Sequence, residues 1–105
     1  FRLDDNGKFM WPGFGDNLRV LNWIIDRCED KVDAVETPIG YLPKPEDINT
    51  DGLDISKDTL KELLSVDKGI WKEEVKGERE FFEQFGDRLP KQIKDELERL
   101  EDRLS

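Results

Sequence analysis

The sequence predicts a mainly α-helical fold with a few short β-strands, an α+β arrangement. Three observations support this prediction. Apolar residues recur at helical spacing in four stretches, which begin near Asp16, Ser56, Asp67 and Pro90. The stretch 31–43 lacks a helical period and places β-branched residues among prolines, which is typical of short extended segments. A loop rich in glycine and aromatic residues precedes the first helical stretch.

Length and composition set limits on the protein's class and partners. With 105 residues, the chain suits one small domain over 1–105 with a modest core. Its formal net charge of -9 argues against nucleic acid and anionic membranes as partners. No apolar run reaches the length of a membrane span and no signal-peptide pattern opens the chain, so we expect a cytoplasmic protein.

Residues 1–17 are predicted to form a hairpin followed by an aromatic loop. The run Asp4-Asp5-Asn6-Gly7 is a turn signature that would fold Phe9 back beside Phe1. A third ring, Phe14, then arrives in a loop that contains a proline and two glycines and leads into a helix. Rings beside the unpaired N–H groups of a helix start suit a heterocyclic base. On residue types alone, a turn that pins the helix to a core remains the favoured interpretation.

The next segment, 18–30, is predicted to be a helix that provides the first half of the core. Its apolar stripe consists of Leu18, Leu21, Ile25 and Cys28, with Val20 and Ile24 beside it. We expect Trp23, on the flank, to pack against a neighbouring element. Arg19 faces away from the stripe and could pair with Asp16 or Asp26. Cys28 is expected to be a buried free thiol with a structural role, because the chain holds no second cysteine.

Residues 31–55 are predicted to be extended or loop. The acidic run 44–52 lacks the spacing of a calcium-binding loop and is interpreted as a solvated turn. Residues 56–105 are predicted to be helical. Ser56 and Asp67 should cap two helices, and Pro90 should start the last one. The aromatics between 70 and 85 are spaced as core, and the last helix could lie on the domain surface or pair with a second copy.

Several motifs together resemble one enzyme family. They are Phe1-Arg2, then Gly7-Lys8-Phe9-Met10-Trp11-Pro12-Gly13-Phe14-Gly15-Asp16-Asn17, then Arg19-Val20-Leu21, Thr37-Pro38-Ile39-Gly40-Tyr41-Leu42-Pro43, Trp71-Lys72-Glu73-Glu74-Val75 and Leu89-Pro90. In this order they resemble the C-terminal segment of GTP-dependent phosphoenolpyruvate carboxykinases, over essentially the whole chain. The resemblance implies a C-terminal helical subdomain of a larger α/β enzyme. The sequence departs from the family pattern at Met10, Asp16 and Leu18, where Leu, Glu and Ser are commoner.

The resemblance also implies a guanine-binding site. In the family three phenylalanines box the guanine ring, and they match Phe1, Phe9 and Phe14. Gly15 and Asp16 match residues that line the base edge, and Asn17 matches the residue whose amide reads guanine. Stacking holds any base, so selectivity must come from the edge. Guanine presents an O6 acceptor where adenine presents an N6 donor, so an N–H aimed there favours guanine.

For the parent enzyme, the resemblance implies conversion of oxaloacetate and GTP to phosphoenolpyruvate, GDP and carbon dioxide in gluconeogenesis, with manganese and, on the nucleotide, magnesium. The family's metal site uses a histidine, which this chain lacks, and no Walker-type loop is present. We therefore expect no catalytic or metal-binding residue here and no turnover by the isolated chain. Its expected partners are guanine nucleotide and the remainder of a monomeric parent, and exposed apolar surface could make the fragment self-associate. The alternative is a small acidic helical interaction module without nucleotide binding.

Overall fold

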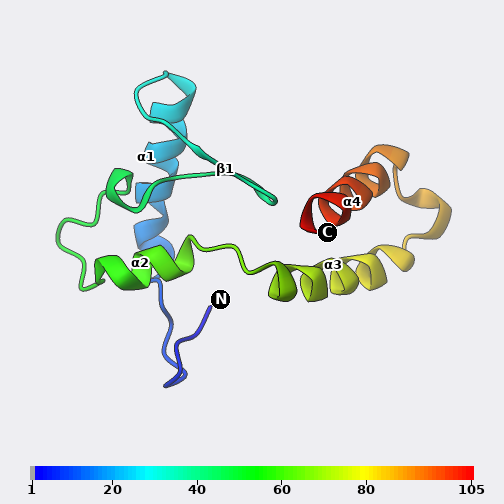
Figure 1. Cartoon of the computed structure of the whole chain (residues 1–105), viewed down its shortest axis with the longest axis horizontal. Helices are drawn as coiled ribbons and strands as arrows, with labels where there is room; N and C mark the ends of the chain where they lie inside the picture. Colours follow the sequence, from blue (N-terminus) through cyan, green and yellow to red (C-terminus); the bar gives the residue numbers. More distant parts are fainter. Residues whose placement is uncertain (1) are drawn as a thin grey trace. The chain divides into compact units, whose positions relative to one another are not determined.

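The computed structural model describes residues 2–105, and Phe1 lies outside the described residues. Its helices are α1 (Asn17–Cys28), α2 (Lys57–Leu63), α3 (Lys68–Glu83) and α4 (Lys91–Leu104). The strands β1 (Val35–Thr37) and β2 (Gly40–Leu42) pair in a two-stranded sheet, and 3₁₀ turns occupy η1 (Phe14–Asp16), η2 (Pro45–Asp47) and η3 (Gly86–Arg88). The predicted class, mainly helical with a few short strands, is thus confirmed (Figure 1).

The described chain divides into two compact units. Unit 1 holds the described residues up to Glu36 together with Tyr41–Ser65, and unit 2 holds Thr37–Gly40 and Val66–Ser105. The tip of the β1–β2 hairpin therefore belongs to unit 2 and its base to unit 1. A single domain over 1–105 stays a prediction.

Unit 1 opens with a hairpin and is built around a small aromatic core. Leu3 and Phe9 form an antiparallel bridge, and Gly7 at the turn has a φ of 78° that favours glycine. Three residues form the buried core: Trp23 of α1, Leu60 of α2, and Ile48, which directly follows η2. Around them lie the partly buried residues Trp11, Val32, Ala34, Ile55 and Leu64. Burial of large rings dominates the stability of so small a core. Trp23 is packed as the sequence predicted.

The apolar stripe of α1 is not part of that core. Leu18, Leu21 and Ile25 are 62%, 51% and 54% exposed, whereas Trp23 is 7% exposed. The prediction that this stripe forms the first half of the core is therefore wrong, because the face carrying Trp23 is the one that meets Ile48 and Leu60. Cys28 is also exposed, which corrects its predicted burial.

Unit 2 consists of α3 and α4 packed side by side, drawn in yellow-green to red in Figure 1, with the hairpin tip. Val75 from α3 and Leu97 and Leu104 from α4 are buried, with Ile39, Trp71, Phe82 and Leu100 partly buried against them. Nε of Arg103 donates a 2.8 Å hydrogen bond to the Pro38 carbonyl, which ties the hairpin tip to α4. Two of the aromatic residues predicted as core, Phe81 and Phe85, are exposed.

Local capping chemistry sets where α2 and α3 begin, as the sequence predicted. The Ser56 hydroxyl accepts from the Thr59 N–H at 3.1 Å, and the Asp67 carboxylate accepts from the Ile70 N–H at 3.0 Å. Pro90 stands one residue before α4 as its cap. None of the helices formed by residues 2–105 combines the length and the apolarity needed to cross a membrane.

Candidate functional site

The aromatic loop that precedes α1 is shaped by a backbone conformation that favours glycine. Gly13 has φ 156° and ψ -176°, a region that is essentially restricted to glycine. The chain then turns through η1, where the Asp16 N–H donates to the Gly13 carbonyl at 3.1 Å. Phe14, at the start of this turn, is 91% exposed. The loop therefore presents a benzyl ring to solvent directly before α1.

Phe14 borders an open groove of about 590 Å³ along the start of α1. The groove is lined by Phe14, Gly15, Asn17, Leu18, Val20 and Leu21. It thus combines an aromatic ring, a glycine backbone, one carboxamide and aliphatic walls. A mostly apolar hollow with a few polar groups is the usual composition of a small-molecule site.

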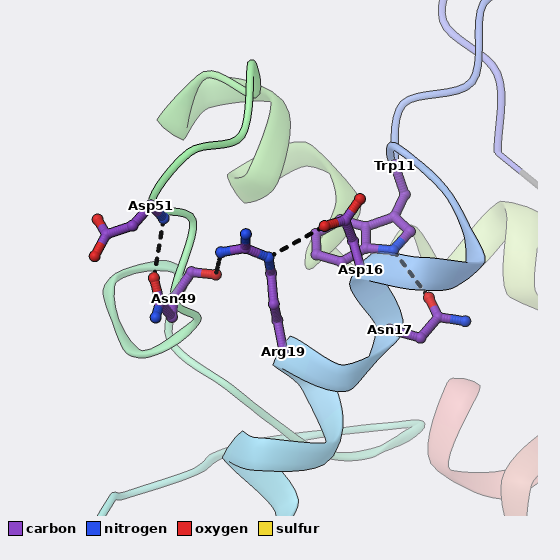
Figure 2. Close-up of polar contacts among 6 residues, drawn as sticks. All are labelled: Trp11, Asp16, Asn17, Arg19, Asn49 and Asp51. Atoms are coloured by element: carbon purple, nitrogen blue, oxygen red, sulfur yellow. Dashed lines mark hydrogen bonds and ion pairs between the residues drawn. The ribbon is translucent and has the colours of Figure 1, made fainter.

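The carboxamide of Asn17 is oriented by a neighbouring indole (Figure 2). Nε1 of Trp11 donates a 2.9 Å hydrogen bond to Oδ1 of Asn17. Figure 2 shows Nδ2 of Asn17 on the side of the carboxamide away from Trp11. Within residues 2–105 this Nδ2 donates to no protein acceptor, so the amide hydrogens remain available to a ligand.

The Asp16 side chain pairs with Arg19 and does not line the groove. Nε of Arg19 donates to Oδ1 of Asp16 at 3.3 Å, and Nη1 of Arg19 donates to the Asn49 carbonyl at 2.9 Å. The Asn49 side chain in turn accepts from the Asp51 N–H at 2.9 Å, as Figure 2 shows. One guanidinium thereby links the start of α1 to the loop that follows η2. Of the two carboxylates the sequence offered as partners of Arg19, the structure selects Asp16.

The sequence-predicted site residues do not all meet in one hollow. Phe14, Gly15 and Asn17 line the groove, and Asp16 lies beside it without lining it. Phe9 borders a different hollow together with Met10, Ser56 and Thr59. Phe1 lies outside the described residues. The three-ring box therefore stays a prediction.

Sequence reasoning missed residues that the geometry adds to the site. The sequence motifs give no role to Trp11, and helical spacing predicts Leu18, Val20 and Leu21 to be part of the core. Trp11 and Asn17 are six positions apart, and a turn of that length is a signal that both side chains can meet. Helical spacing alone could not show that the aliphatic residues line a groove, since a stripe fits a core and a ligand equally well.

The residues of this chain also match a known protein family. The family model described as "Phosphoenolpyruvate carboxykinase C-terminal P-loop domain" matches residues 1–103. The chain therefore belongs to this family, as the motifs indicated.

Individual relatives carry a more specific name. A protein of Treponema pallidum (strain Nichols) named "Phosphoenolpyruvate carboxykinase [GTP]" is 54% identical over 106 residues, covering 100% of this chain and 17% of that protein. Proteins of the same name from Chlamydia muridarum and Renibacterium salmoninarum are 52% and 49% identical over 99% of this chain, which covers 18% and 17% of their lengths. The chain thus spans less than a fifth of the curated relatives it matches.

Proposed function

We propose that this chain forms the guanine-holding part of a GTP-dependent phosphoenolpyruvate carboxykinase, which converts oxaloacetate and GTP to phosphoenolpyruvate, GDP and carbon dioxide. The observation that carries the proposal is that Phe14 and Asn17, at positions matching the family's guanine residues, line the same groove. The relatives are enzymes named for GTP, so a base-binding groove in this segment has a substrate to hold.

The two side chains have complementary tasks in this proposal. The exposed ring of Phe14 stacks on the base, an interaction of about 1–3 kcal/mol that does not distinguish one base from another. Nδ2 of Asn17 donates to guanine O6, whereas adenine would place an N6 donor against the same donor. Phe1 and Phe9 complete the box around the base, and Gly15 lets it approach the backbone. Asp16 holds the edge of the site in place.

The remaining chemistry belongs to the rest of the enzyme. Within residues 2–105 no three or more His, Cys, Asp or Glu side chains gather into a group that could hold a metal ion. No catalytic step is assigned to these residues. We propose that a larger, monomeric α/β enzyme of the cytoplasm, working in gluconeogenesis, supplies the metal ions, the phosphate contacts and the catalytic groups.

Titration of the 105-residue chain with GTP and ATP by ligand-detected NMR tests this function. Stacking plus one or two hydrogen bonds predicts a dissociation constant for GTP of about 1 mM or weaker, with ATP weaker still. Phe14→Ala should abolish the binding signal of GTP and that of ATP. Phe81→Ala, at another exposed ring, should change neither signal. Equal binding of the two nucleotides would contradict the proposal.

The same samples address the competing interpretation. A small acidic helical interaction module predicts that neither nucleotide binds and that Phe14→Ala alters the oligomeric state instead. The comparisons lend no support to that module. Because the proposed site handles only the base, the chain alone should show no carboxykinase turnover, and measurable turnover by the purified chain would refute this part.

A further inference from the structure

We propose that Trp11 is a positioning residue for base selectivity, because its indole N–H fixes which end of the Asn17 carboxamide faces the base. This inference rests on the proposed function and adds a residue to its site. It concerns the orientation of one amide, which decides whether the groove offers a donor or an acceptor to the purine edge.

A carboxamide is ambiguous as a reader of bases. Its oxygen accepts and its NH₂ group donates, and a half-turn about the last side-chain bond exchanges the two. With the NH₂ group toward the ligand, Asn17 favours the O6 acceptor of guanine. With the oxygen toward the ligand, it would favour the N6 donor of adenine. Asn17 by itself therefore does not determine which purine is preferred.

The indole of Trp11 removes this ambiguity. An indole N–H donates and cannot accept, so at 2.9 Å only Oδ1 of Asn17 can stand opposite Nε1. Rotating the amide would set two donors against each other and lose the hydrogen bond. Nδ2 consequently points away from Trp11, as Figure 2 shows. The groove offers a donor for the position that guanine O6 occupies.

Trp11 is well placed to impose this orientation on Asn17. Its ring is partly buried against the core cluster that contains Trp23, Ile48 and Leu60, whereas Asn17 is exposed. Pro12 follows directly and restricts the backbone of Trp11. The indole is thus anchored on the core side and the carboxamide adapts to it.

A pair of matched variants isolates the N–H group. Trp11→Phe keeps an aromatic ring against the core and removes the donor. Trp23→Phe makes the same chemical change in the same core, at an indole whose Nε1 has no partner among the described residues. Both variants are titrated with GTP, inosine triphosphate, ATP and the triphosphate of 2-aminopurine riboside. GTP and inosine triphosphate carry O6, whereas ATP and the 2-aminopurine nucleotide do not.

Trp11→Phe should weaken GTP and inosine triphosphate by about two- to tenfold, the factor expected for one neutral hydrogen bond, and should lower the GTP to ATP preference. The 2-aminopurine nucleotide should be unaffected, and Trp23→Phe should retain the preference. Equal weakening of all four nucleotides, or an unchanged preference in Trp11→Phe, would overturn the inference and leave the proposed function standing. If the unmodified chain shows no purine preference, the proposed function fails first and this inference with it.

A second measurement does not depend on how well Trp11→Phe folds. In the unmodified chain the Trp11 indole N–H should exchange with solvent more slowly than in Asn17→Ala, since the 2.9 Å bond protects it. The Trp23 indole N–H serves as the internal reference. Equal exchange of the Trp11 N–H in the two proteins would show that the bond is absent and would overturn the inference.

Discussion

The carboxylate of Asp16 and the guanidinium of Arg19 meet at 3.3 Å across the start of α1, and both side chains are partly buried. Because Arg19 also donates to the Asn49 carbonyl, the pair joins the aromatic loop to a segment 30 residues further along the chain. This relationship gives Asp16 a structural task at the edge of the groove. It explains how a carboxylate is accommodated beside a site proposed for a nucleotide.

Arg19→Ala should lower the free energy of unfolding by about 1–2 kcal/mol, because it removes the bond to the Asn49 carbonyl together with the pair to Asp16. Arg19→Lys should restore little of this stability, since one ammonium group cannot donate to Asp16 and to the Asn49 carbonyl in the geometry of the planar guanidinium. Urea denaturation followed by tryptophan fluorescence measures both changes. If the free energy of unfolding of Arg19→Ala lies within about 0.5 kcal/mol of that of the unmodified chain, the two Arg19 interactions do not stabilise the fold as predicted.

Gly13→Ala should destabilise the aromatic loop through backbone strain alone. No atom lies within 4 Å of an added Cβ at this position, but the φ of 156° disfavours any residue with a side chain. The expected cost is about 1–3 kcal/mol. Gly15→Ala provides the matched control, because that site has the same open surroundings without a positive φ. Equal urea midpoints for the two variants would show that the conformation of Gly13 is not strained.

The exposed stripe of α1 should matter little for stability and more for association. Ile25 is 54% exposed, so Ile25→Gln should change the free energy of unfolding by no more than about 0.5 kcal/mol, whereas Trp23→Ala, in the core, should cost about 3–5 kcal/mol. Sedimentation should show the unmodified chain self-associating with rising concentration and Ile25→Gln doing so less. If the unmodified chain is monomeric at all concentrations, the predicted self-association is wrong.

The pKa of Lys76 tests the ion pair that this residue forms with Glu73 on the surface of unit 2. Its pKa is raised above 10.5 by the hydrogen bond that its ammonium donates to Glu73 at 2.6 Å and by the charge of that carboxylate. The pKa of Lys76 is higher in the folded chain than in the unfolded chain. The contribution of the Lys76–Glu73 pair to the free energy of unfolding is therefore fully present below pH 10.5 and is lost as the pH rises through the folded-state pKa. NMR titration of Glu73→Gln should return the Lys76 pKa toward 10.5. An unchanged pKa in that variant would exclude Glu73 as the cause.

The local signals in the sequence predicted the helical elements well. Ser56 and Asp67 accept hydrogen bonds at the N-termini of α2 and α3, and the turn ending at Gly7 reverses the chain, because these interactions join residues a few positions apart. Which face of α1 is buried depends instead on Ile48 and Leu60, far along the chain. Periodicity identified an amphipathic helix, but one large ring, Trp23, outweighed the longer aliphatic stripe.

For the candidate site, too, the sequence predicted the residues of local motifs but not the contacts that depend on the fold. Motifs indicated Phe14, Gly15 and Asn17, which line one groove, but they gave no role to Trp11. The bond between Trp11 and Asn17 depends on how the loop through Gly13 and η1 curves, and residue types do not encode that curvature. Hydrogen-bond direction, and with it the orientation of the amide, emerges only from three-dimensional geometry.

The most direct test of the guanine site is a protein-detected titration of the ¹⁵N-labelled chain with GTP and, separately, with ATP. We predict that GTP shifts the resonances of the backbone amides of Phe14 and Gly15 and of the side-chain NH₂ of Asn17, and that ATP at equal concentration shifts them clearly less. Shifts of the same size with both nucleotides, or shifts confined to residues outside the groove, would contradict it.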